Sequence, residues 1–507
     1  KKASRFFDEV VSAEGGYLWR YSEDLAVREG EGKANATTVW VQPPGTPTVG
    51  TALLDAYKAT GDDFHLDAAR RTGHCLVRGQ LRSGGWDYRI VFDEKERARR
   101  AYRVDRPLEG KSQGNTSTLD DDTTQAALRF LMALDAGLQQ SDAAIHEAAM
   151  TGLEALLAVQ YPIGAWPQRF EGPPRADDFP IRQASYPDSW SWEYPGKDYK
   201  TFYTFNDNAI ADVIDVMFLA AEQYGDRRFR AAAERAGQFM LLAQMPDPQP
   251  GWAQQYDANM QPAWARKFEP PAVTGGESQG VMRALMEVYR RTGDKKYLEP
   301  IPRALQYYRR SLLADGRLAR FYELRTNRPL YFTKDYQLTY SDADMPTHYS
   351  FKVGSSLDQI EREFERLSQT PIDQRNPPAK KAPQKPSKSQ ESRVRSVLAS
   401  LDSQGRWVEN GRMRYHGDAD PTRPSAMAAA TATAASAATT ITPAMKDRQS
   451  RTGAASSNVG TQYRAPVRAP QVITRSRTGH PGPFPMSLGG RIIPGTIRPV
   501  RLPRHVA

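Results

Sequence analysis

Two clusters of acidic and amide side chains stand where helices are expected to begin. Asp120–Asp122 lie in SQGNTSTLDDDTTQ, and Asn206–Asn208 lie in TFYTFNDNA. Acids at a helix start often only stabilise the helix, so capping is the alternative interpretation of both clusters. Carboxylate and amide oxygens without cysteine are typical ligands of a hard cation such as calcium. If both helices start at the same end of the fold, the two clusters can approach one another.

A second group of residues is typical of sugar binding. The segment GWAQQYDANMQPAWARKFEPPAVTGGES contains Trp264 and Arg266, and the planar guanidinium of an arginine matches a carboxylate. The same segment holds Trp252, Tyr256 and Phe268. These aromatic side chains form either a stacking floor for sugar rings or the packing of a long loop.

Positive charge is concentrated in the segment LARFYELRTNRPLYFTKDY, which contains Arg320, Arg325, Arg328 and Lys334. Four cations within 15 residues are often only a solvated face. Here aromatic and aliphatic residues interleave with the cations, which predicts that some cations leave the solvent. Carboxylates, arginines and aromatics together suit an acidic sugar polymer, because its uronate carboxylates need both metal and guanidinium partners.

The elements that must position these residues follow from a repeat. Four stretches share a helix end, a tight turn, a second helix and an extended exit, and their aligned turn acids are Asp62, Asp142, Asp226 and Asp294. These acids are 80, 84 and 68 residues apart, which is too long for tetratricopeptide or ankyrin units. The repeat therefore predicts helix hairpins separated by long excursions, with a turn residue that caps the second helix.

Apolar residues at helical spacing support these hairpins. Two stripes follow the i, i+3, i+4, i+7 pattern: Ala127, Phe130, Leu131 and Leu134, and Ile210, Val213, Ile214 and Met217. Hairpins arranged around an axis predict an all-α fold, an α/α toroid whose long loops form a cleft. Function is expected in the excursions, which are residues 83–120, 161–205, 246–275 and 316–350.

Composition and charge divide the chain of 507 residues. A single cysteine, Cys75, excludes a disulfide scaffold and a cysteine-built zinc site. Residues 371–507 carry 22 lysines and arginines against 7 acids, whereas residues 1–370 carry 47 against 52, so the net charge of +10 belongs to the C-terminal part. We expect a toroid domain over 1–370, a linker over 371–390, a short helix and turn over 391–420, and a disordered basic tail over 421–507. No apolar run approaches the length of a membrane span.

Five ordered motifs resemble those of the family 10 pectate lyases, also called pectic acid lyases. STLDDDTTQAALRFL is similar to the STIDN-type segment of that family. YPIGAWPQ, FNDNA, GWAQQYD with WARKFEPPAV and GGES, and RFYELRTNRPLY follow in the family's order. The resemblance extends over roughly residues 45–350. It implies that the toroid is an incomplete α/α toroid of the (α/α)3 barrel type, and it implies dependence on Ca2+ and cleavage of polygalacturonate by β-elimination.

The resemblance also implies roles for individual residues. Asp120 and Asp207 are expected to bind calcium, and Lys334 is expected to be the catalytic base at a position where the family has arginine. Asp121 stands where the family usually has asparagine. The expected substrate-binding residues are Asp121, Arg266, Arg320, Arg328, Trp166 and Trp264. The segment before FNDNA is longer than the resemblance leads us to expect, and its Trp190, Trp192 and Tyr194 form either further sugar subsites or a self-packed loop.

Three other functions compete with a pectate lyase. An inverting glycoside hydrolase on the same toroid would use two carboxyl groups and release saturated sugars. A homologue with a disabled base would bind polyuronate without cleaving it. Nucleic-acid binding through the basic tail ranks last, because the tail has no base-reading motif. We expect a monomer that acts on pectate, is secreted or periplasmic because of its substrate, and has no nucleic-acid or membrane partner.

Overall fold

The computed structural model describes residues 1–108, 112–196, 198–371, 388–408, 411 and 413–416, and the backbone of Ser425–Met427. All of them belong to one compact unit, Lys1–Ala469. The predicted tail over 421–507 therefore lies outside the described residues, apart from β16 (Ser425–Met427), which pairs with β1 (Arg20–Ser22). None of the helices in the described part of the chain has the length and apolarity that crossing a bilayer requires.

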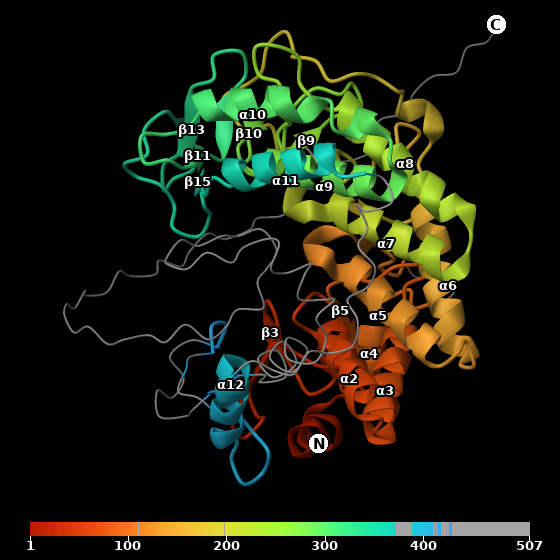
Figure 1. The fold of residues 1–507 in the computed structure, drawn as a ribbon. Coiled ribbons are helices and arrows are strands. Elements are labelled where there is room, and N and C mark those ends of the chain that lie inside the picture. Colours follow the sequence, from red (N-terminus) through yellow and green to blue (C-terminus); the bar gives the residue numbers. More distant parts are fainter. Residues whose placement is uncertain are drawn as a thin grey trace, which may run out of the picture. The chain divides into compact units, whose positions relative to one another are not determined.

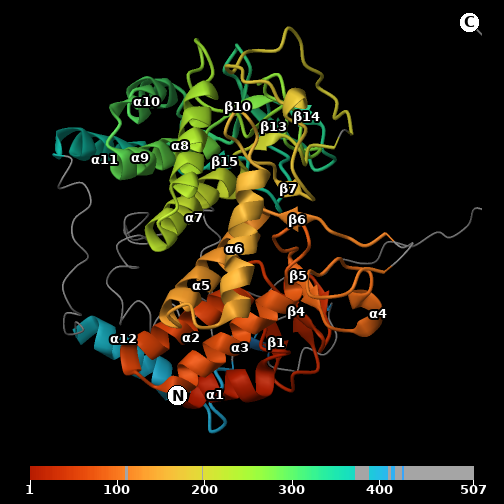
Figure 2. The ribbon, with the colours of Figure 1, turned by 90° about the vertical axis from the view of Figure 1, so that its right-hand side faces the viewer.

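Helical hairpins follow one another in chain order and form the predicted incomplete α/α toroid (Figures 1 and 2). Their bounds are α2 (Thr46–Thr60) with α3 (Asp63–Gly79), α5 (Thr123–Gly137) with α6 (Ala143–Ala158), α7 (Ala209–Tyr224) with α8 (Arg227–Leu242), and α9 (Glu277–Thr292) with η5 (Lys295–Tyr297) and α10 (Pro300–Arg310). The first helices α2, α5, α7 and α9 contact one another in sequence, as do α3, α6 and α8. α11 (Leu357–Gln369) packs against α9 and α10.

The turns between paired helices form as predicted. Gly61, Gly225 and Gly293 end their helices with φ of 67°, 71° and 78°, a conformation that glycine adopts without strain. The four turn aspartates then accept a backbone N–H of the following helix. Every residue of the two predicted apolar stripes on α5 and α7 is buried, so these stripes face the core.

The structure also contains short antiparallel strands, most of them in the excursions, that an all-α prediction omits. The pairs are β4 (Thr38–Trp40) with β5 (Arg89–Val91), β6 (Ser117–Thr118) with β7 (Arg169–Phe170), β8 (Tyr203–Thr204) with β9 (Gln255–Tyr256), and β11 (Leu318–Ala319) with β15 (Lys352–Val353). A four-stranded sheet has the order β10 (Ala272–Thr274), β12 (Phe321–Glu323), β13 (Pro329–Phe332) and β14 (Leu338–Thr339). Strands of two to four residues are too short to show an alternating pattern in the sequence.

Smaller elements complete the described chain. They are α1 (Lys2–Phe6), η1 (Phe7–Val11), β2 (Arg28–Glu29), β3 (Lys33–Ala34), α4 (Glu94–Arg97), η2 (Asp120–Asp122), η3 (Ala176–Asp178), η4 (Asn206–Asn208) and α12 (Lys388–Ala399). α12 is the predicted short helix, and it begins inside the segment that was predicted as a linker. Among all these elements, η2 and η4 matter most for chemistry, because they contact each other and lie at the starts of α5 and α7.

Candidate active site

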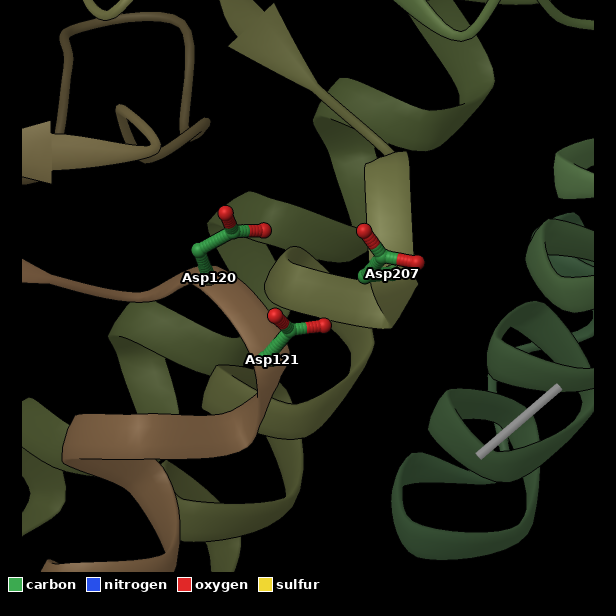
Figure 3. A group of neighbouring side chains, drawn as sticks. All are labelled: Asp120, Asp121 and Asp207. Carbon is green, nitrogen blue, oxygen red and sulfur yellow. The ribbon is translucent and has the colours of Figure 1, made fainter. Parts of the chain in front are cut away.

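The starts of α5 and α7 bring three carboxylates together (Figure 3). Asp120, Asp121 and Asp207 each have an oxygen within 4.8 Å of an oxygen of the other two. Asp120 and Asp121 are half-buried and Asp207 is exposed. The expected approach of the two helix starts therefore occurs, and it places Asp121, predicted to bind substrate, in the same cluster as the two predicted calcium ligands.

The two helix starts share an unusual backbone conformation. Asp121 has φ 50° and ψ 36°, and Asp207 has φ 47° and ψ 34°. The next residue is also left-handed in both turns, with φ 60° at Asp122 and 59° at Asn208. Such φ values cost a non-glycine residue roughly 1–2 kcal/mol and persist where the surroundings impose them, often at functional sites. None of these side chains caps its helix, so the capping interpretation is wrong for both clusters.

The acids of the cluster destabilise one another. Burial, followed by the charges of Asp120 and Asp207, raises the pKa of Asp121. Loss of solvation around the carboxylate and the charge of Asp120 raise the pKa of Asp207, although much of this residue is exposed. The second oxygen of Asp120, Oδ1, is buried and has no hydrogen-bond partner among the residues that the structure describes. Crowded carboxylates with an unpartnered buried oxygen fit a hard divalent cation, which would relieve both the repulsion and the missing partner.

One oxygen of each aspartate accepts a hydrogen bond from an uncharged side chain. The donors are Tyr88 Oη to Asp120 Oδ2 at 2.6 Å, Gln42 Nε2 to Asp121 Oδ2 at 2.8 Å, and Asn206 Nδ2 to Asp207 Oδ2 at 2.6 Å. Sequence reasoning did not identify Gln42 or Tyr88, because neither belongs to a cluster of charged or metal-binding residues. Their role is visible only when the strands β4 and β5 are in place.

Arg266 faces this cluster and is held by Glu269. Nε and Nη2 of Arg266 donate to the two carboxylate oxygens of Glu269 at 2.8 and 2.5 Å. The charge of Arg266 lowers the pKa of both Asp121 and Asp207, against the larger effects of burial and neighbouring acids. Among the described residues, no acceptor contacts the remaining nitrogen, Nη1, and the side chain is 38% exposed.

Arg320, which lies between β11 and β12, approaches the same cluster from further along the chain. It is buried, and its Nη1 donates to Glu277 Oε1 and to the Tyr349 hydroxyl, each at 3.0 Å. The hydroxyl of Tyr349 in turn donates to Glu269 Oε1 at 3.0 Å, so the two arginines belong to one network. The charge of Arg320 also lowers the pKa of Asp207. Two of the predicted substrate-binding arginines therefore act on the acids.

Lys334 and Arg328 lie elsewhere. Lys334 is 67% exposed, and its Nζ is 2.8 Å from Asp344 Oδ1. The hydrogen bond and the charge of Asp344 raise the pKa of Lys334. The guanidinium of Arg328 lies 3.3 Å from the ring centre of Tyr340. Neither cation is among the groups that shift the pKa of Asp121 or Asp207.

The tryptophans predicted to bind substrate are packed in the protein. Trp166 is 1% exposed and donates Nε1 to the carbonyl of Leu156 at 2.8 Å. Trp86 and Trp252 make the same kind of bond to Leu76 and Met240, so the three are equivalent core positions. Because no ring face of Trp166 is open, we assign this residue to the core and not to substrate binding. A glycine one or two residues before each tryptophan in the repeats was the available signal.

Trp264 anchors the long segment before α7. It is 7% exposed, its Nε1 donates to the Ser191 carbonyl at 2.9 Å, and its ring contacts Tyr194. Trp190 and Trp192 stack on each other with ring centres 5.8 Å apart. Most of this aromatic group is therefore engaged in packing, although Trp192 remains 40% exposed.

Comparison with known proteins places part of the chain in a family. Residues 92–318 match the family model described as pectic acid lyase. No curated protein matches the chain. A solved family 10 polysaccharide lyase from Cellvibrio cellulosa is similar at 20% identity and a TM-score of 0.44, covering 64% of this chain and 97% of that one. A mutant of a family 10 lyase from the same organism, in complex with trigalacturonic acid, is similar at 20% identity and a TM-score of 0.43, covering 63% of this chain and 98% of that one. A D-mannose isomerase is similar at 14% identity and a TM-score of 0.39, covering 63% of this chain and 70% of that one.

The family match and the site coincide. The matched residues include the three clustered aspartates, Arg266 and Glu269, and they end just before Arg320. The five motifs that suggested this family from the sequence therefore pointed to the right one. Residues 92–318 belong to the pectic acid lyase family.

Proposed function

We propose that the protein is a pectate lyase that cleaves α-1,4-polygalacturonate by calcium-assisted β-elimination. The single observation that supports this most is the convergence of Asp120, Asp121 and Asp207 beside Arg266, within a pectic acid lyase domain. A uronic acid polymer presents a carboxylate on every sugar. Such a substrate needs both a divalent cation and guanidinium groups. This site offers carboxylate ligands for the cation, and its arginines supply the guanidinium groups.

The three aspartates would hold the calcium ion through their carboxylate oxygens. When bound, calcium neutralises the uronate carboxylate of the substrate, which makes the adjacent C5 proton more acidic. Arg320 is already fixed by Glu277 and Tyr349, so it can bind that carboxylate without further ordering of its side chain. Arg266 and Arg320 stabilise the negative charge that develops on the carboxylate as the C5 proton leaves.

We place the proton acceptor at Arg266. Lys334 is exposed, paired with Asp344 and outside the group of charges that act on the cluster, whereas Arg266 lies within that group and has an unpartnered Nη1. Glu269 raises the pKa of Arg266, so this role requires the neutral guanidine and predicts activity that rises into the alkaline range. Lys334 as the base, at a position where the family has arginine, is the competing assignment.

The elimination consists of a proton transfer, the formation of a double bond and the cleavage of the C4–O4 bond. The C5 proton passes to Nη1 of neutral Arg266, the C5–H electron pair forms the C4–C5 double bond, and the bond from C4 to O4 breaks with its electrons on O4. A proton from water completes the hydroxyl at O4, and the hydroxide left behind takes the proton from Arg266, which regenerates both the water and the neutral guanidine. One product carries a sugar with a 4,5-double bond at its non-reducing end, and the other carries a new reducing end. No water is taken up overall.

A set of variants tests this assignment. Polygalacturonate is incubated with wild type, Arg266→Ala, Lys334→Ala and Lys334→Arg, with calcium or with a chelator, and the unsaturated product is followed by its ultraviolet absorbance. We expect Arg266→Ala to lose about 10²–10⁴-fold in kcat, the usual contribution of a positioned proton acceptor. Both Lys334 variants should stay within a few-fold of wild type. If Lys334→Ala were inactive and Arg266→Ala active, the base would be Lys334.

The other functions give different products in the same assay. An inverting glycoside hydrolase would release saturated sugars without calcium, and it needs carboxyl groups about 6.5–9.5 Å apart. The three clustered aspartates offer oxygens within 4.8 Å of one another, which is closer than that separation. A non-catalytic binder would retain pectate without forming any product. Because pectate is found outside cells, we also propose that the protein works as a secreted or periplasmic monomer.

A further inference from the structure

The residues that hold the acidic cluster come partly from outside the family match. Gln42 and Tyr88 each donate a hydrogen bond to one aspartate, and both precede residue 92, where the match begins. Asn206 makes the third such bond from within the match. The cluster is thus completed by the first 91 residues of the chain.

The amide of Gln42 can be oriented in only one way. Gln42 is 4% exposed, and its Oε1 accepts a hydrogen bond from Trp40 Nε1 at 3.0 Å. Because indole nitrogen is only a donor, the amide oxygen must face Trp40, and the amide nitrogen then faces Asp121. Trp40 is itself buried on β4, which pairs with β5. The donor to Asp121 is therefore preset by the fold.

Tyr88 is connected to Gln42 through the backbone. The N–H of Val41, next to Gln42, donates to the carbonyl of Tyr88 at 2.7 Å, so Gln42, just past β4, and Tyr88, just before β5, lie close together. The Tyr88 hydroxyl accepts from Arg169 Nη2 at 3.2 Å and donates to Asp120 at 2.6 Å. With one oxygen of Asp120 engaged in this way, the other is the buried oxygen for which the described part of the chain offers no partner.

We propose that Gln42 and Tyr88 are positioning residues for the calcium-binding carboxylates. Each occupies one oxygen of an aspartate and leaves the other oxygen for the ion. Both donors are uncharged, so they fix the carboxylates without cancelling the negative charge that attracts a cation. This inference rests on the proposed function, because it takes the cluster to be a calcium site. It extends the site to a part of the chain that the family match does not include.

Calcium affinity of the full chain tests the proposal. We would titrate wild type, Gln42→Met and Tyr88→Phe with calcium by isothermal titration calorimetry. Outer partners of metal ligands usually contribute about 10- to 100-fold in affinity, and we expect a loss of that size in each variant. At saturating calcium, kcat should recover toward that of wild type. Trp40→Phe should weaken binding less, and adding it to Gln42→Met should weaken binding no further.

Two neighbouring residues provide matched controls. Gln223 Nε2 donates to the carbonyl of Met132, and Tyr224 Oη donates to Asp135 at the other end of α5, both at 2.9 Å. Gln223→Met and Tyr224→Phe remove the same groups away from the cluster and should leave calcium affinity unchanged. If folded Gln42→Met and Tyr88→Phe bound calcium as tightly as wild type, the inference would be wrong. If wild type bound no calcium at all, the proposed calcium site itself would be wrong.

Discussion

Both ends of the helical hairpins carry aspartates, and the two sets behave in opposite ways. At the turns, Asp62, Asp142, Asp226 and Asp294 are extended N-cap residues whose side chains accept backbone N–H groups. At the ends of the excursions, Asp121 and Asp207 are left-handed and accept no bond from their helices. A position at a helix start therefore does not decide what an aspartate does. The backbone conformation decides whether the carboxylate turns back to the helix or out to a neighbouring acid.

Electrostatics shows the same contrast. Hydrogen bonds from Arg228 and Lys296 lower the pKa of the turn residues Asp226 and Asp294. Burial and mutual repulsion raise the pKa of Asp121 and Asp207. The turn acids therefore favour the ionised folded state, whereas the clustered acids oppose it. Carboxylates that destabilise the protein when no ion is bound, and that can bind a cation, are expected at a binding site.

The largest expected effect separates the two sets by activity. Asp121→Ala and Asp207→Ala should each lower kcat/KM on polygalacturonate by about 10²–10³-fold, because each removes a calcium ligand that supplies several kcal/mol to the transition state. The matched change at a turn, Asp142→Ala, should leave the kcat of the folded fraction near that of wild type. Equal losses at both ends would abolish the distinction.

A smaller effect concerns the stability that a turn aspartate contributes. Asp142 is buried, caps α6 and accepts from Arg70 Nε at 2.6 Å and from His74 Nε2 at 3.0 Å. Asp142→Ala should therefore lower the free energy of unfolding by about 1–2 kcal/mol. Urea unfolding measures this loss. Asp142→Asn should lose less, since asparagine also caps, and an unchanged midpoint for the alanine variant would contradict the role of the cap.

The smallest effect is a gain in stability at the cluster. Unfolded aspartate has a pKa of about 3.9, and the folded pKa of Asp121 and Asp207 is higher, so above that pH the folded protein binds more protons than the unfolded chain. The stability of calcium-free protein should therefore fall as the pH rises from about 4 through the raised pKa values. Asp121→Asn removes one of these groups and should add about 1 kcal/mol near neutral pH. Unfolding of wild type and Asp121→Asn in a chelator at several pH values measures the pH dependence and the gain. With calcium present, wild type should be the more stable of the two.

The hairpins and the approach of the two acidic clusters were predictable, and the reasons are local. The stripe on α5, the turn acids and the motifs around Asp120 and Asp207 are all visible at short range in the sequence. The left-handed turns were not predictable, because they contain no glycine to signal a positive φ. The partner of Lys334 also escaped prediction, since Asp344 is ten residues away and across a strand pair.

Gln42 illustrates what a sequence motif cannot contain. Its bond to Asp121 joins residues 79 apart and depends on Trp40, which fixes the amide through a strand pair too short to predict. Trp166 illustrates the reverse case, in which a motif residue was given a function although its repeat partners, Trp86 and Trp252, indicate packing. Comparing repeats within one chain distinguishes such structural positions from the unrepeated ones that do chemistry.

The most direct test of the central claim is the initial rate of unsaturated product formation from polygalacturonate at controlled concentrations of free calcium. The account predicts that wild type forms no product in excess chelator, that the rate rises and saturates with calcium, and that Asp207→Asn requires far more calcium. An unchanged rate in excess chelator, or products with only saturated ends, would contradict it.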